Sequence, residues 1–221
     1  MDLDTFKKQF IREELGLGEE YGRIFTFIDF GNVNNWFVSD TQDWENKPLK
    51  ENQGIEIDVH KLKEFADIFS VRTRAHYGHD PHNAGSQKFT YVMRKAFGKR
   101  EFVTKRLQRI KHYIGDGEKQ ESLFVRYDKE GQQYIEIRKS NFDVEVAVDA
   151  TKMLPHYDTC CLFSGDADFA YLNQHLRSKG KKVILIKAGY ITEELRDSAD
   201  LVLNAQRVKK YIAQKVEKTR T

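Results

Sequence analysis

Two aspartates one residue apart follow a short apolar run in the second half of the chain. The segment Tyr157–Phe169 reads YDTCCLFSGDADF, so Asp166 and Asp168 come directly after Ser164 and Gly165. An apolar run of this length, bounded by charge and by Ser-Gly, is typical of a buried strand. Two neighbouring carboxylates repel each other unless a cation or a shared proton lies between them. Capping of the next helix explains one of the aspartates. Two caps for one helix are unnecessary, so the pair indicates a functional site.

A further carboxylate ends an apolar run near the start of the chain, in RIFTFIDFGN. Ile24–Ile28 is predicted to be the first strand, with Asp29 at its carboxyl end and Asn32 in the turn. A carboxylate directly after a buried strand is costly without a partner. Ligands of open α/β sheets bind beyond the carboxyl ends of the strands, so we expect Asp29 near Asp166. Asn32 either joins that site or caps the next helix.

The third acidic stretch is NFDVEVAVDATKML, which predicts an amphipathic helix over Asn141–Leu154. Asp143 falls in its first turn, where the helix dipole favours an anion. Asp149 lies about 120° further round the helix, so the two carboxylates cannot both face one site closely. Glu145 shares a face with Asp149. The spacing alone leaves open which of the two joins the site.

Other residues of metal-binding type are poorly placed. His76, His79 and His82 fall in a predicted strand end and loop, without a helix to fix their spacing, and we expect no metal site there. Cys160 and Cys161 point to opposite faces of one strand. They fit no zinc spacing and are predicted to be reduced core residues.

Charge is distributed unevenly over the 221 residues, although the net charge is only +3. Residues 82–126 contain 11 Lys/Arg and 4 Asp/Glu, and residues 206–221 contain 6 and 1, so the rest of the chain carries −9. A basic arm and a basic tail around an acidic body favour the binding of a polyanion near carboxylates. A solvated, Lys/Arg-rich surface explains part of this pattern.

Composition predicts a folded chain with a core, because 39% of the residues are hydrophobic, and the sequence contains 15 Phe and 10 Tyr. No run reaches the roughly 20 apolar residues of a membrane span, and MDLDTFKKQF lacks a signal-peptide core. We expect a cytoplasmic protein with no membrane partner. Its predicted parts are an N-terminal helix (1–20), the α/β domain (21–205) with a β-hairpin insertion at about 113–138, and a helical basic tail (206–221).

Four motifs together resemble the NYN domain of the PIN-like nuclease superfamily, in its LabA-like branch. FIDFGN, KSNFD at Lys139–Asp143, SGDADF and SADL at Ser198–Leu201 occur in the family's order, and the match runs from about Ile24 to Leu203. The resemblance implies a Rossmann-like, mainly parallel sheet flanked by helices. The hairpin insertion and the basic tail depart from the family pattern and leave the choice of substrate open.

What the resemblance implies chemically is a metal-dependent ribonuclease. The family positions map onto six residues: Asp29, Asn32, Asp143, Ser164, Asp166 and Asp168. Hydrolysis of a phosphodiester needs an activated water and a cation on the phosphate. Mg²⁺ or Mn²⁺ takes oxygen ligands and keeps several waters, so three or four carboxylates suffice. Asp29, Asp143 and Asp166 are expected to bind the metal, and Asp168 to complete the acidic ring or orient the water. Asn32 and Ser164 are expected to be neutral positioning groups.

The basic arm is expected to hold single-stranded RNA, with Tyr91, Phe97 or Tyr113 stacking on bases. The residues expected to contact nucleic acid are Lys95, Lys99, Arg100, Lys105, Arg106 and Arg109. The sequence leaves open whether the chain forms a homodimer. One alternative is a catalytically idle module that binds RNA or serves regulation, but all four aspartates are kept here. A dehalogenase-like phosphatase would need a second Asp where Gly31 stands.

Overall fold

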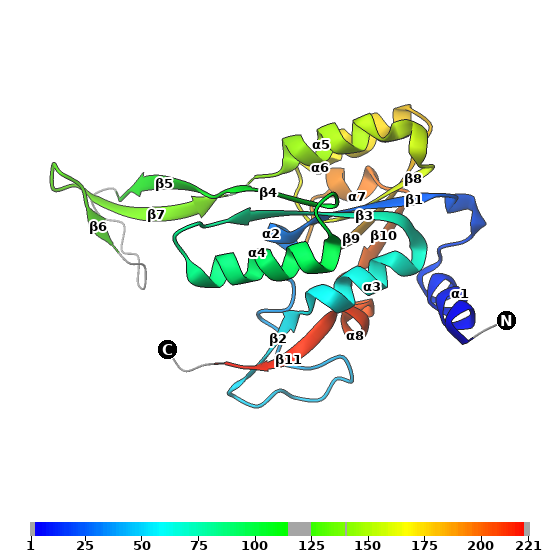
Figure 1. The fold of residues 1–221 in the computed structure, drawn as a ribbon, viewed down its shortest axis with the longest axis horizontal. Helices are drawn as coiled ribbons and strands as arrows, with labels where there is room; N and C mark the ends of the chain where they lie inside the picture. The colour runs from blue at the N-terminus through cyan, green and yellow to red at the C-terminus, as the bar shows by residue number, and fades with distance from the viewer. Residues whose placement is uncertain (1–2, 115–124, 140, 219–221) are drawn as a thin grey trace.

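The computed structural model describes residues 3–114, 125–139 and 141–218. Its centre is a six-stranded sheet in the order β10-β9-β8-β1-β3-β4, in which all neighbouring strands are parallel. The strands are β1 (Ile24–Asp29), β3 (Ser70–His79), β4 (Phe102–Arg106), β8 (Thr159–Phe163), β9 (Lys182–Lys187) and β10 (Leu201–Asn204). The mainly parallel α/β sheet that the sequence predicts is confirmed (Figure 1).

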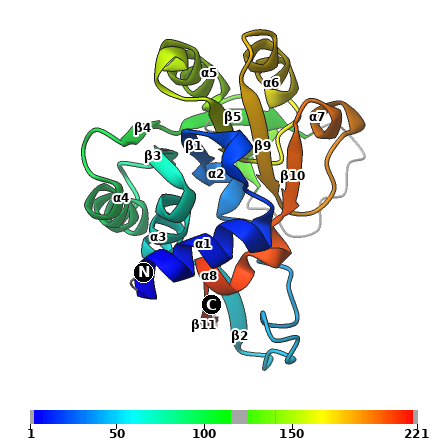
Figure 2. The same cartoon turned by 90° about the vertical axis from the view of Figure 1, so that its right-hand side faces the viewer.

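Helices cover both faces of this sheet (Figure 2). One layer comprises α1 (Leu3–Leu15), α2 (Phe30–Val33), α3 (Val59–Phe69), α4 (Ala84–Phe97) and α8 (Lys209–Ile212); the other comprises α5 (Asp143–Lys152), α6 (Phe169–Ser178) and α7 (Glu193–Asp197). Side chains of each strand point alternately to the two faces of the sheet, and each face has its own hydrophobic core. Ile24 and Ile28 pack in the core on the side of α3, and Phe25 and Phe27 pack in the core on the side of α5. This is why the strands are apolar throughout rather than alternating.

The direction of winding reverses between β1 and β8. From β1 the chain moves through β3 to β4 at one edge, then returns by α5 to place β8 on the other side of β1, followed by β9 and β10. Ligands of doubly wound sheets bind at such a reversal, beyond the carboxyl ends of the strands. Here those ends are Asp29 and Phe163.

A three-stranded antiparallel sheet projects from the body as an arm (Figure 1). It consists of β5 (Gln108–Tyr113), β7 (Gln133–Lys139) and β6 (Arg126–Tyr127), in that order. The predicted hairpin is confirmed by the pairing of β6 with β7. The two strands before the hairpin belong to different sheets, since β4 pairs with β3 in the main sheet and β5 pairs with β7 in the arm.

The prediction of a helical basic tail is wrong beyond Ile212. Helix α8 has four residues, and the chain continues as β11 (Ala213–Glu217), antiparallel to β2 (Gln53–Ile57). Contacts with residues distant in sequence explain this strand. Ile212 and Ala213 are buried in the core, and Lys215 Nζ lies 2.6 Å from Asp43 Oδ2. The tail is therefore part of the fold. In the described part of the chain, no helix has the length and apolarity needed to cross a membrane.

Candidate active site

Three aspartates converge where the sheet reverses. Asp143 is the first residue of α5, and Asp166 and Asp168 lie in the turn between β8 and α6. One carboxylate oxygen of each lies within 4.8 Å of one oxygen of the other two. Asp143 and Asp166 are half-buried and Asp168 is exposed. The structure thus brings together three of the four carboxylates that the sequence assigns to one crevice.

The Ser-Gly-Asp turn is held by local hydrogen bonds. The N–H of Asp166 donates to Ser164 Oγ at 3.2 Å, and the N–H of Asp168 donates to Asp166 Oδ1 at 3.1 Å. Asp168 occupies the N-cap position of α6, yet its side chain accepts no capping bond. Capping of α6 therefore does not explain the carboxylate of Asp168.

Asp29 joins the three aspartates through Ser164. The fully buried Ser164 hydroxyl donates to Asp29 Oδ2 at 3.1 Å, so one side chain contacts both Asp29 and the N–H of Asp166. Burial raises the pKa of Asp29, and the charge of Asp166 adds to this, although Ser164 partly offsets it. Asp29 itself lies outside the group whose oxygens meet within 4.8 Å.

Asn32 braces the two loops that carry the aspartates. Its Oδ1 accepts from Gly165 N–H at 3.1 Å and from Trp36 Nε1 at 2.9 Å. Helix α2, which directly follows β1, is thereby tied to the loop after β8. The amide oxygen is engaged in this contact, and Asn32 lies within α2 rather than at a cap position.

The electrostatics of the group favour a cation. Burial raises the pKa of Asp143, and Asp166, Asp168 and Asp29 add to the rise, while the Asn141 side chain opposes it. Carboxylates that raise each other's pKa are relieved by a positive charge between them. An all-oxygen donor set with open sides suits Mg²⁺ or Mn²⁺, which retain part of their water shell. The residues present therefore fit such an ion.

Asp149 and Glu145 lie on another face of α5, as the helical spacing predicts. Arg74 Nη1 lies 2.8 Å from Asp149 Oδ2, and His76 Nε2 lies 3.3 Å from the same atom. Lys105 Nζ donates to both oxygens of Glu145, at 2.7 and 2.8 Å. Neither carboxylate belongs to the group of three.

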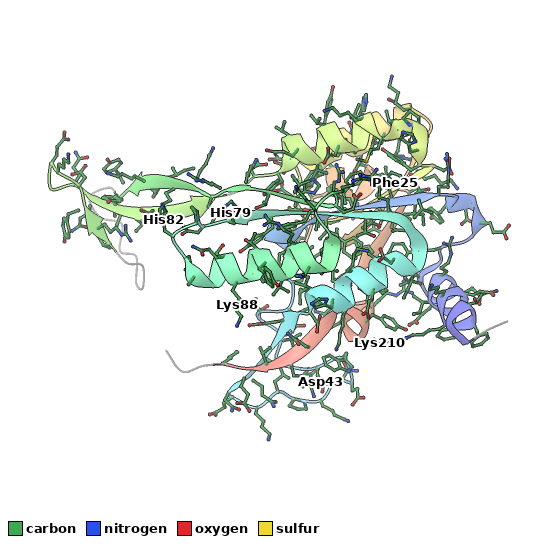
Figure 3. The ribbon with its side chains drawn as sticks, viewed as in Figure 1. Phe25, Asp43, His79, His82, Lys88 and Lys210 are labelled. Carbon is green, nitrogen blue, oxygen red and sulfur yellow. The ribbon has the colours of Figure 1, made fainter. Side chains whose placement is uncertain are left out.

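The three histidines do not form a metal group in the described residues. His76 is fully buried beside Asp149. His79 contacts Thr104 and the Lys105 carbonyl, and it lies with His82 where β3 meets the arm (Figure 3). Sequence reasoning missed the pairing of His76 with Asp149, because no local pattern links residues 73 positions apart.

The six basic residues expected to bind nucleic acid fall into two sets. Lys105 pairs with Glu145, and Arg109 pairs with the buried Asp80 at 3.0 Å and with Glu136 at 3.4 Å. The other four are all exposed, and none forms an ion pair within the described residues: Lys95, Lys99, Arg100 and Arg106. The sequence did not predict the acidic partners of the first set, because these partners are distant in sequence from Lys105 and Arg109.

The chain is similar to a known domain family and to two proteins from other organisms. The family model of the NYN domain matches residues 27–206. The low amplitude and bright protein LabA of Synechococcus elongatus is 29% identical over 86 residues, 38% of this chain and 45% of that protein. An uncharacterized protein of Methanocaldococcus jannaschii is 37% identical over 86 residues, 37% of this chain and 35% of that protein. The aligned part of the chain thus spans less than half of either relative.

A solved structure shares the fold. The crystal structure of a protein of unknown function from Vibrio parahaemolyticus aligns with a TM-score of 0.52 and 19% identity, over 85% of this chain and 94% of that one. At this identity the likeness concerns the fold alone.

Proposed function

Because the chain belongs to the NYN domain family, within the PIN-like nuclease superfamily, we propose that it is a metal-dependent ribonuclease. The observation that carries the proposal is the convergence of Asp143, Asp166 and Asp168 within 4.8 Å at the reversal of the sheet. An acidic group at this position serves to hold a divalent cation against a phosphodiester.

In this proposal Asp143 and Asp166 hold the metal directly, and Asp29 contributes directly or through water. A bound Mg²⁺ or Mn²⁺ would supply positive charge to the phosphate and lower the pKa of a coordinated water. Asp168, the exposed member, orients the attacking water. Ser164 fixes the orientation of Asp29, and Asn32 fixes the spacing of the two loops.

The proposed substrate is single-stranded RNA, held by the exposed cations of α4 and β4. A cytoplasmic location is in keeping with Cys160 and Cys161, which are buried and unpaired.

The test is cleavage of mixed labelled RNA and DNA by the purified protein with Mn²⁺, Mg²⁺ or EDTA. We expect RNA cleavage that requires metal. Asp166→Asn should reduce the rate at saturating RNA by at least about 100-fold, since it removes a ligand that acts in the transition state. Asp197→Asn removes an exposed carboxylate of α7 and should leave the rate unchanged.

Metal-independent cleavage, or equal rates for the two variants, would reject the assigned site. RNA binding without cleavage under all metal conditions would instead favour the catalytically idle module.

A further inference from the structure

A groove of about 390 Å³ runs along α5 and α6 from the aspartate group. Both helices begin at the carboxyl ends of the strands, so Asp143 and Asp168 stand at the same end of the groove. The remaining wall is mainly apolar and consists of Val144, Ala147, Phe169, Tyr171 and Leu172, with Thr151 and His175 further along. The groove therefore joins charged oxygens at one end to an apolar surface.

Two side chains of this groove are unusually exposed. Tyr171 is 80% exposed and Val144 is 71% exposed, and in the described residues only Tyr190, at 90%, exceeds them among large apolar side chains. Phe169 and Leu172 form the floor and are buried. Exposed apolar side chains gathered beside a hollow mark a binding surface.

The occupant must have a charged end and a flat apolar end. A phosphate bridged by a cation fits the carboxylates, and an unstacked base fits the aromatic and aliphatic walls. On the premise of the proposed function, we propose that the groove binds the base of the nucleotide adjacent to the scissile phosphate, with Tyr171 as its stacking residue. The substrate is thereby single-stranded, because a paired base cannot enter.

A second copy of the chain is disfavoured as occupant by charge. In a two-fold symmetric dimer the same patch meets itself. An interface over this groove would cover Asp143 and Asp168 of both copies without supplying a cation, which adds a desolvation cost to the repulsion already present within one copy.

The experiment combines a protein variant with a change in the RNA. Wild type and Tyr171→Ala are compared on a short single-stranded RNA and on versions with one abasic residue at each position, in Mn²⁺. For wild type, the abasic residue next to the cut should raise KM by about 5- to 150-fold, the equivalent of one stacked base. Tyr171→Ala should raise KM on intact RNA similarly, and the abasic residue should add nothing.

Two control variants separate stacking from other effects. Tyr171→Phe keeps the ring and should behave as wild type. Phe6→Ala removes a ring that is 60% exposed on α1, in the opposite helix layer, and should leave KM and the abasic effect unchanged.

Failure of the base site differs from failure of the nuclease proposal. Cleavage with a wild-type KM and abasic effect in Tyr171→Ala overturns the site and leaves the nuclease standing. If wild type cuts no RNA, its binding of the same RNAs in Mn²⁺ decides. A loss of affinity on removal of the base that occurs in wild type and not in Tyr171→Ala supports the site, and no loss in wild type overturns it. A dimer that Val144→Glu dissociates without changing KM assigns the groove to a second copy, which also overturns the proposal.

Discussion

Asp143 is held in a fold that disfavours its charged form. Burial, followed by the charges of Asp166, Asp168 and Asp29, raises its pKa. For a carboxyl with a raised pKa, the stabilising contribution is present below its pKa in the unfolded chain and is lost as the pH rises through its pKa in the folded state. Without metal, the ionised aspartate therefore destabilises the protein at neutral pH.

We predict that Asp143→Asn has a higher melting temperature than wild type in EDTA at pH 7 to 8. The advantage should shrink as the pH falls through the raised pKa, and disappear below the ordinary Asp value of about 3.9. Thermal unfolding over a pH series measures this. Asp197→Asn, on the exposed surface of α7, is the matched control, and a pH-independent gain for Asp143→Asn would contradict the explanation.

The position of Asp149 could be predicted from the sequence, but its ion-pair partners could not. Helical spacing was sufficient to predict that Asp149 turns away from Asp143. It could not supply the partners Arg74 and His76, which lie on β3. Although burial opposes it, the pKa of Asp149 is lowered because His76 and Arg74 bind its carboxylate. Asp149 is thus a structural ion-pair residue in this fold.

At the scale of elements, strand positions were predictable where burial decides them. The apolar runs before Asp29 and Ser164 correspond to β1 and β8, because a strand buried on both faces needs no alternation. The C-terminal tail was not predictable from its composition. Lys209 is 3% exposed and lies 2.6 Å from Asp40, and β11 pairs with β2, so contacts distant in sequence set its structure.

Three exposed cations lie between the last turn of α4 and the start of β4: Lys95, Lys99 and Arg100. Lys99 and Arg100 line a groove of about 430 Å³ between β4 and α5. They lie at the amino end of β4, which spans roughly 16 Å for its five residues. The aspartates lie at the carboxyl ends of the strands. RNA that contacts both would place different nucleotides at each.

Replacing Lys95, Lys99 and Arg100 together by alanine should lower the log–log salt slope of RNA binding by up to about 2, or about 0.7 per phosphate contact. Because these residues lie away from the aspartates, cleavage at saturating RNA should change little. Titration of labelled RNA at several salt concentrations measures the slope. Arg109→Ala, which breaks a pair with buried Asp80, should instead lower thermal stability. An unchanged slope for the triple variant would identify these cations as an ordinary solvated surface.

At the scale of the molecule, the site joins both halves of the sheet. Asp29 is the last residue of β1, after which the chain continues to β3 and β4, whereas Asp166 and Asp168 follow β8, after which it continues to β9 and β10. Asn32 and Ser164 connect the two loops. A cation bound there contacts parts of the chain that separate on unfolding, so its binding free energy adds to the stability of the whole domain.

Metal binding should therefore raise the melting temperature of the intact protein. At a metal concentration of 100 times Kd the gain is about 2.7 kcal/mol, which for a chain of this size is a shift of about 5 to 10 °C. Mn²⁺ or Mg²⁺ should produce this shift in wild type and in Asp197→Asn, and a much smaller one in Asp166→Asn. EDTA should reverse it, and NaCl of equal ionic strength should not reproduce it. Equal shifts in Asp166→Asn and wild type would place the ion elsewhere, because the metal binds less tightly, and so raises the melting temperature less, only if the replaced carboxylate is one of its ligands.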